Sequence, residues 1–216
     1  MLIVIQCAST KTPGAGFLRS SDGKPVSFVA NPTAAPPNND CLYARPDDLA
    51  DDGRSWRKVL LDYNAQTDNS LQLLMAYRLY ENRVYEQLVA KFGLDQVYIL
   101  SAGWGLIRAS FLTPYYDITF SASAELYKRR RPSDPYDDFC MMQAGIDDRV
   151  VFFGGKDYIP LFCRLTESIK TAKTVFFNLK SPPSAPGCKL QRFPTTTKTN
   201  WHYECANAFL EGKVLL

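Results

Sequence analysis

Four short segments hold most of the residue types that can bind or transform a ligand, and each follows a hydrophobic run typical of a buried strand. They are residues 7–11, 101–105, 154–158 and 178–181, which carry glycines, lysines and small polar residues. Because parallel strands end at one edge of a sheet, where open α/β domains bind ligands, we expect these segments to converge. Ordinary strand-to-helix turns are the competing interpretation. The predicted substrate contacts are Cys7, Ser9, Lys11, Ser101, Trp104, Gly105, Tyr116, Lys156, Tyr158 and Asn178.

Two carboxylates and the single histidine are the candidate catalytic groups. Asp117 ends a loop beside Tyr116, Asp157 follows the third hydrophobic run, and His202 is the only imidazole in the chain. A carboxylate can act as an acid, a base or an electrostatic catalyst. A helix cap or a salt bridge is the competing interpretation for Asp117.

The sequence lacks the motifs of several common enzyme classes. There is no GxxxxGK[ST] and no GxGxxG, so the nucleoside-triphosphatase and dinucleotide fingerprints are both missing. There is also no GxSxG nucleophile elbow. Six cysteines without a CxxC pair and one histidine do not make zinc-ligand spacing. We therefore expect neither a metal nor an organic cofactor.

Strands and helices are predicted to alternate along the chain. The hydrophobic runs predict strands at 2–6, 96–100, 150–153 and 174–177. Three- and four-residue spacing predicts helices at 69–92, 124–144, 157–173 and 201–211, the second of them interrupted by Pro132 and Pro135. This order predicts an α/β fold with a central, largely parallel sheet of about four core strands flanked by helices.

The chain, residues 1–216, is expected to form a single domain, because its 46% hydrophobic content suits one sizeable core. Residues 12–52 are rich in Pro, Gly, Asn and Asp and are predicted to form a long irregular excursion. Residues 181–200 are predicted to form a basic loop rich in Pro and Thr. No apolar run is long enough to span a membrane, and scattered cysteines suit a reducing compartment. We expect a cytoplasmic protein with no membrane partner and no evident obligate protein partner.

Basic and aromatic residues in the carboxyl-terminal half favour a nucleic-acid partner, DNA more than RNA. The net charge of +3 is too small to decide the matter. Lysine and arginine neutralise phosphates, and tryptophan stacks on bases or wedges between them. A solvated helix face, a helix cap and helix packing are the competing interpretations. The predicted interface residues are Lys128, Arg129, Arg130, Arg131, Lys180, Lys189, Arg192, Lys198, Asn200 and Trp201.

One stretch resembles a known group of proteins. Residues 100–107, with the sequence LSAGWGLI, and the later pair Tyr116-Asp117 are similar to the "LSAxxGLL…PYD" signature of domain-of-unknown-function proteins grouped near the YaaA peroxide-stress family. Cys7-x-Ser9-x-Lys11 and Gly155-x-x-Tyr158 are similar to two further motifs of that group. The proline expected directly before the Tyr-Asp pair is replaced by Tyr115. The resemblance implies nucleic-acid binding and the handling of DNA bases.

Three functions compete on this evidence. The first is a DNA N-glycosylase, a hydrolase that excises a flipped and possibly modified nucleobase. In it, Asp117 or Asp157 stabilises the sugar cation, Trp104 and Tyr116 sandwich the base, Asn178 reads its edge, and His202 or Lys11 neutralises the leaving group. The second is a non-catalytic DNA-binding stress-response protein. The third is an enzyme that acts on free nucleotides or nucleosides. Core packing is the competing interpretation for Trp104.

Overall fold

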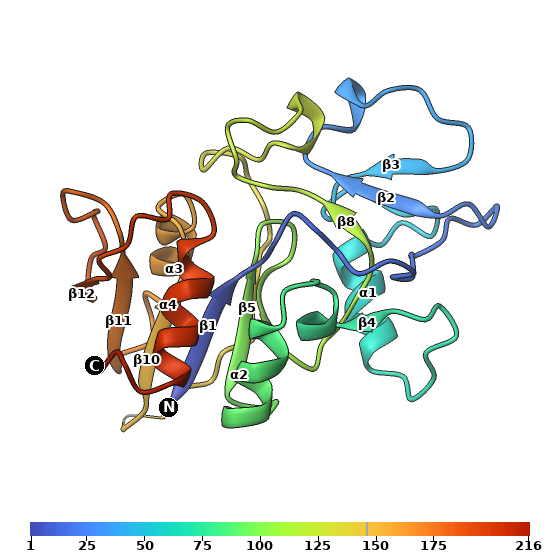
Figure 1. The fold of residues 1–216 in the computed structure, drawn as a ribbon. Coiled ribbons are helices and arrows are strands. Elements are labelled where there is room, and N and C mark those ends of the chain that lie inside the picture. Colours follow the sequence, from blue (N-terminus) through green and yellow to red (C-terminus); the bar gives the residue numbers. More distant parts are fainter. Residues whose placement is uncertain (146) are drawn as a thin grey trace.

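A seven-stranded mixed sheet forms the centre of the computed structural model, which describes residues 1–145 and 147–216 (Figure 1). Its strand order is β12-β11-β10-β1-β5-β6-β9. Neighbouring strands are parallel except for the antiparallel pair β5 and β6. The bounds are β1 Leu2–Gln6, β5 Val97–Ser101, β6 Gly105–Arg108, β9 Phe139–Cys140, β10 Arg149–Phe153, β11 Ala172–Phe177 and β12 Lys189–Arg192.

Helices cover both faces of this sheet, which explains why its central strands are apolar throughout. Adjacent side chains of β10 point to opposite faces: Phe152 stacks on Phe162 of α3 (Ile159–Leu165) with ring centroids 4.6 Å apart, and Phe153 packs on Phe209 of α4 (Trp201–Leu210) at 5.4 Å. The helix α2 (Val84–Phe92) packs beside α4 and contacts β1 and β5. The architecture is therefore α/β with helices on the two faces.

The strand β1 lies between β5 and β10. The chain first adds β5, β6 and β9 on one side of β1, and it then returns to add β10, β11 and β12 on the other side. Gln6 is in register with Leu100, and Ile5 with Phe153, so the carboxyl ends of β1, β5 and β10 lie at one edge. Such a reversal of strand order leaves a crevice at the carboxyl edge, where ligands of open α/β sheets bind.

The segment 12–52 is more regular than its composition predicts. Its strand β2 (Val26–Val29) pairs in parallel with β3 (Leu42–Ala44) on one side and with β8 (Tyr116–Asp117) on the other, which forms a second, three-stranded sheet. Phe28 of β2 is fully buried between the rings of Trp56 and Trp104. The segment therefore folds against residues far along the chain, and Figure 1 shows this sheet beyond the carboxyl end of β5.

The remaining elements connect the two sheets. They are α1 (Trp56–Asn64), the antiparallel pair β4 (Leu74–Met75) and β7 (Leu112–Thr113), and the 3-10 turns η1 (Pro32–Ala34), η2 (Ala76–Arg78) and η3 (Leu126–Lys128). Ser55 caps α1 by accepting a hydrogen bond from the backbone N–H of Lys58. None of these elements was predicted from the sequence, because most are too short for a periodic pattern to emerge.

All four predicted strands belong to the central sheet, but the expected count of about four was too low. The sheet also contains β6, β9 and β12. The strand β12 has the sequence KLQR, which lacks a hydrophobic run, and β9 contains two residues. Both are edge strands, where one neighbour is missing and polar residues are tolerated.

The helix predictions need correction at three places. Residues 69–92 are helical only over α2, because their first half contains β4 and η2. Residues 124–144 form η3, turns and β9 instead of a helix, since Pro132 and Pro135 prevent helical backbone hydrogen bonds. The helix predicted at 157–173 is the shorter α3, whereas the terminal helix matches α4 closely. Across the described residues, no helix is both long and apolar enough to cross a membrane.

Candidate functional site

A wide basin of about 1100 Å³ opens at the carboxyl edge of the central sheet. Its walls come from the loops that follow β1, β10 and β11, from residues 115–128 and from residues 198–203. Several predicted residues line it: Cys7, Ser9, Asp117, Lys128, Lys156, Asp157, Tyr158, Asn178, Lys198, Asn200, Trp201 and His202. The convergence expected of the loops after β1, β10 and β11 is therefore present.

The loops after β1 and β10 are held together by the side chain of Gln6. Its Oε1 atom accepts a hydrogen bond of 2.6 Å from the backbone N–H of Gly155, and its carbonyl accepts one of 2.8 Å from the hydroxyl of Tyr85. Tyr85 is also hydrogen bonded to Tyr203 of α4 at 3.1 Å. These contacts fix the floor of the basin to both neighbouring helices.

Asp117 lies in the basin wall at the end of β8, with 24% of its side chain exposed. Lys128 approaches it with an Nζ to Oδ2 distance of 2.9 Å and also contacts Glu125 at 2.6 Å. The hydrogen bonds to Glu125 and Asp117 raise the pKa of Lys128, so its ammonium stays charged. Asp117 therefore forms a salt bridge, as its competing interpretation predicted, and its carboxylate also faces the basin.

A chain of buried hydroxyls lies beneath the basin. The hydroxyl of Ser101 donates a 2.9 Å hydrogen bond to that of Tyr116, which is 2.8 Å from the hydroxyl of Tyr80. The thiol of Cys7 is 3.2 Å from the hydroxyl of Tyr158. Burial raises the pKa values of the three tyrosines well above 10, so these groups stay protonated at neutral pH.

Lys11 extends beside this hydroxyl chain and is only 8% exposed. Its Nζ atom lies 4.6 Å from the ring centroid of Tyr116 and 5.9 Å from that of Tyr115. Burial lowers the pKa of Lys11, and the nearby groups Cys7 and Asp117 partly offset that effect. Lys11 itself does not line the basin, but Cys7, Tyr115 and Asp117, which surround its amine, all do.

His202 lines the basin from the first turn of α4 while its side chain is almost entirely buried, at 2% exposure. Burial lowers the pKa of its imidazole to about 3, so the ring is neutral at physiological pH. Its Nε2 atom has no hydrogen-bond partner within the described part of the chain. A neutral imidazole can donate or accept one hydrogen bond at this wall of the basin.

The predicted base-stacking role of Trp104 and Tyr116 is wrong, because both side chains are fully buried. The ring of Trp104 packs against Phe28 at 5.0 Å and lies parallel to Phe139 at 6.5 Å. Its competing interpretation as a core residue is confirmed. Tyr116 contributes its hydroxyl to the buried chain and offers no ring face to a ligand.

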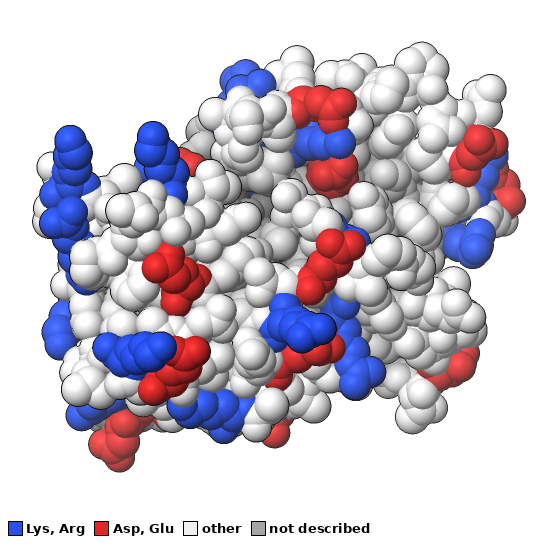
Figure 2. Space-filling view, in the orientation of Figure 1, with Lys and Arg blue, Asp and Glu red and all other residues white. Residues whose placement is uncertain are grey.

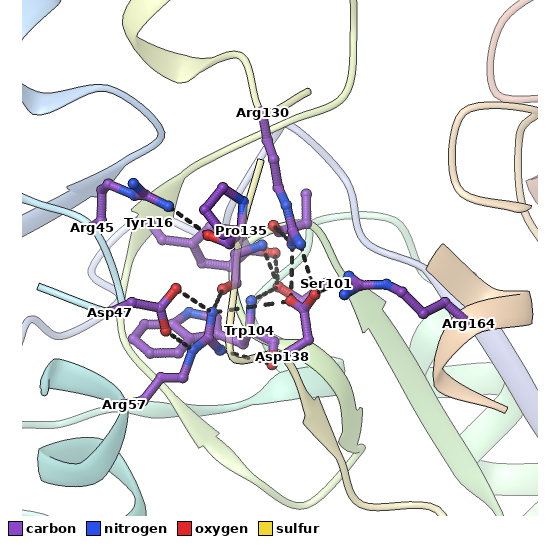
Figure 3. A network of polar contacts seen from close by, with 12 residues as sticks. Arg45, Asp47, Arg57, Ser101, Trp104, Tyr116, Arg130, Pro135, Asp138 and Arg164 are labelled. Carbon is purple, nitrogen blue, oxygen red and sulfur yellow. Dashed lines mark hydrogen bonds and ion pairs between the residues drawn. The ribbon is translucent and has the colours of Figure 1, made fainter. Parts of the chain in front are cut away.

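A polar network of arginine and aspartate side chains surrounds the turn that carries Trp104 (Figure 3). Arg57 donates to the carbonyls of Gly103 and Trp104 at 2.8 and 3.1 Å, and Arg130 donates to that of Ala102 at 2.7 Å. Ser101 accepts hydrogen bonds from the backbone N–H groups of Gly103 and Trp104. The segment 101–105, expected to bind substrate, therefore serves mainly to build the core.

Gly105 is required by this packing and does not contact the basin. Its φ of +88° lies in the left-handed region, and a Cβ atom there would lie 2.5 Å from the carbonyl oxygen of Phe139. Only glycine permits β6 to run this close to β9. The substrate-contact prediction for Gly105 and for the buried Ser101 is corrected accordingly.

The residues predicted to form a nucleic-acid interface do not share one surface, and several of them are buried. Arg130 is 2% exposed and paired with Asp138, so it is not free to contact a phosphate. Trp201 is 5% exposed and stacks on Phe193 at 6.5 Å, which confirms the packing interpretation and excludes a wedge. Asn200 occupies the N-cap position of α4, but its side chain makes no capping hydrogen bond.

Other basic residues of the predicted interface lie outside the basin. These are the half-buried Arg129 and the exposed Arg131, Lys180, Lys189 and Arg192. Figure 2 shows lysine and arginine interspersed with aspartate and glutamate on the face in view. The basin lining itself holds three lysines and four carboxylates. This mixture differs from the one-sided positive surface that a duplex backbone selects.

Some residues of the site were missed by the sequence analysis. Tyr80 was assigned to the apolar face of a helix and Tyr85 was given no role, because nothing local distinguishes a tyrosine that packs from one that donates to a distant partner. Glu125 lies in a segment predicted to be helical, Thr119 lies just before that segment and was given no role, and Tyr115 was taken only as a departure from a motif. Their signal was their nearness to Asp117 in sequence.

No family model, curated protein or solved structure matches this chain. The site is therefore interpreted from its own chemistry. Within residues 1–145 and 147–216, no group of three or more His, Cys, Asp or Glu side chains is arranged to hold a metal ion.

Proposed function

We propose that this protein is an enzyme that cleaves the N-glycosidic bond of a nucleoside or nucleotide, and that its substrate is the free compound. The observation that carries the proposal is the carboxylate of Asp117, which faces a polar basin at the point where the strand order reverses. The basin volume of about 1100 Å³ exceeds that of a nucleotide and matches the upper range of small-molecule sites.

The groups around the basin suit the charges that develop when such a bond breaks. Positive charge grows on the sugar, and the carboxylate of Asp117 stabilises it or orients a water molecule. Negative charge grows on the departing base, and the neutral imidazole of His202 supplies a hydrogen bond to it. Lys156 and Lys198 line the basin as exposed cations and suit a substrate phosphate.

Three observations favour a free nucleotide over a base in duplex DNA. The basin lining contains more carboxylates than lysines. The two rings expected to hold a flipped base, Trp104 and Tyr116, are buried in the core. Two of the four residues of the basic run are committed to ion pairs, Lys128 with Asp117 and Arg130 with Asp138.

The proposal is tested by incubating the protein with a panel of nucleosides, nucleotides and oligonucleotides and separating free bases by chromatography. We expect base release from at least one free compound. Asp117→Asn should lower the rate by roughly 100-fold or more, because it removes the charge that stabilises the sugar cation. Asp68→Asn, which alters an exposed carboxylate outside the basin, is the matched control and should retain full activity.

Two results would contradict this function. Base release from oligonucleotides alone would replace the free substrate with DNA. An Asp117→Asn variant that releases base at the rate of the parent protein would remove the carboxylate from the mechanism.

A further inference from the structure

Lys11 is an amine that the fold buries without giving it a partner. The residue is 8% exposed, yet its Nζ atom has no hydrogen bond or ion pair to any residue that the structure describes. Its Nζ atom lies 4.6 Å from the ring centroid of Tyr116, and an aromatic face attracts a cation more weakly than a carboxylate would. The burial of an ammonium without a hydrogen bond is costly, which favours the neutral amine.

A second lysine of the same chain shows that this arrangement is not forced by burial. Lys173 is also 8% exposed, and its Nζ atom donates a 2.7 Å hydrogen bond to the carbonyl oxygen of Thr166. The fold thus satisfies one buried lysine and leaves the other unsatisfied. The unsatisfied one lies under the basin.

The amine of Lys11 lies beside the wall of the basin. Cys7, Tyr115 and Asp117 lie around it, and each of these residues lines the cavity. Asp117 is close enough to interact with it electrostatically, although its direct salt bridge is to Lys128. An amine whose pKa is lowered by burial, and which lies beside a carboxylate at the wall of a ligand cavity, has the environment of a nucleophilic lysine.

We propose that Lys11 is the nucleophile of the reaction and forms a covalent imine with the anomeric carbon of a pentose. This inference rests on the proposed function, because it names how the glycosidic bond would be broken at the same site. It also defines the substrate class, since the ligand must carry an anomeric or aldehyde carbon that the amine can reach.

The step balances without any further reactant except water. The lone pair of the Lys11 amine forms a bond to C1′ while the bond from C1′ to the base nitrogen breaks, and the base leaves with that electron pair. The proton lost from the amine passes to the carboxylate of Asp117 or to the base. The ring oxygen then leaves C1′ and takes up a proton as C1′ becomes an iminium carbon. Water adds to that carbon, and the sugar is released as the aldehyde with the amine restored.

The experiment uses the full chain with 2-deoxyribose 5-phosphate and ribose 5-phosphate as probes, in the presence of cyanoborohydride. The reductant converts an imine to a stable secondary amine, which intact mass and peptide mapping locate. We expect a single adduct on Lys11. Lys11→Met should lose at least roughly tenfold of the labelling, and Lys170→Met, which removes an exposed lysine outside the basin, should retain it within about twofold.

Lys11→Arg separates a covalent role from an electrostatic one, since it keeps a positive charge but cannot form the imine. Its base-release rate should fall as far as that of Lys11→Met. If Lys11→Arg remains active, or if labelling is spread equally over surface lysines and is unchanged in Lys11→Met, the inference is overturned.

Failure of the inference and failure of the proposed function give different results. Base release without any adduct, and with an active Lys11→Arg variant, retains the proposed function and overturns the role of Lys11. An adduct on Lys11 without base release from any compound supports the reactive amine and removes the glycosidic substrate.

Discussion

Two clusters of buried polar groups lie at the carboxyl edge of the sheet, and they differ in how well their charges are matched. In the network beneath Trp104, the side chain of Asp138 is 1% exposed and contacts Arg130 at 2.6 Å and Arg164 at 2.5 Å. Under the basin, Lys11 has no ionic partner among the described residues, and Nε2 of His202 has no hydrogen bond there. The charges of Asp138 and Arg130 are therefore paired, whereas the charge of Lys11 is not.

The difference separates structural from functional burial. A buried charge that finds its counterion and hydrogen bonds contributes to a unique fold, whereas an unmatched one persists only if the surrounding structure forces it. The network around Trp104 also contains buried polar atoms without a hydrogen bond, Nε1 of Trp104 and Nε of Arg130, so an orphaned atom alone does not mark a functional site. Lys11 is assigned to the site by its unpaired charge and its position beside the basin, and His202 by its place in the basin lining.

The largest expected effect comes from breaking the matched network. Asp138→Asn leaves the guanidinium of Arg130 buried with a neutral partner, so the free energy of unfolding should fall by about 3 to 5 kcal/mol. Urea denaturation of both proteins measures the change.

An exposed ion pair serves as the control for this variant. Asp52 and Arg54 form a 2.5 Å pair with nearly half of each side chain exposed, so solvent screens it and Asp52→Asn should change the free energy of unfolding far less than Asp138→Asn does. If Asp138→Asn proved as mild as Asp52→Asn, the network would not be the structural element described above.

A smaller effect, dependent on pH, is expected from His202. Its pKa is about 3 in the folded chain and 6.5 as a model value, so the unfolded chain binds the extra proton first as pH falls. The stabilisation by the neutral ring is complete above pH 6.5 and is lost as pH falls from 6.5 toward 3, at up to about 1.4 kcal/mol per pH unit.

The matched variant is His202→Gln, which does not titrate in this range. Between pH 7 and pH 5 the parent protein should lose about 2 kcal/mol more of its free energy of unfolding than the variant does. Parallel stability curves for the two proteins over this range would show that the imidazole is not buried in its neutral form.

The central strands and the place of the carboxylates could be predicted from the sequence, because strands buried on both faces leave an unbroken apolar run. Residues 150–153 and 174–177 needed no tertiary information to be recognised. Asp117 was expected at the carboxyl edge and is found in the basin wall. The prediction for Asp117 depended on the Tyr116-Asp117 motif and on the position of Asp117 at the end of a loop.

The environments of individual side chains could not be predicted, because distant parts of the chain determine them. Phe28 of β2 covers Trp104, and β8 pairs with β2 across nearly ninety positions of sequence, so a segment with a loop-like composition becomes a sheet. Arg130 is removed from a basic run by Asp138, whose side chain is buried beside it only in the folded chain. The local sequence pattern predicts neither the strand pairing of β2 with β8 nor the ion pair of Arg130 with Asp138.

The smallest expected effect, and the most direct test of the comparison, is the stability of Lys11→Met. The folded chain lowers the pKa of Lys11 below the unfolded value of 10.5, so the burial of this amine opposes folding at neutral pH, and its cost falls as pH rises from the folded pKa to 10.5. Replacing it with an apolar side chain of similar length should raise the free energy of unfolding by about 1 kcal/mol.

The decisive measurement is the thermal unfolding of Lys11→Met beside the parent protein at pH 7, with base release assayed on the same samples. The account predicts a melting temperature about 2 to 4 °C higher together with loss of activity. A lower melting temperature with activity intact would mean that the amine of Lys11 holds the fold together and takes no part in the site.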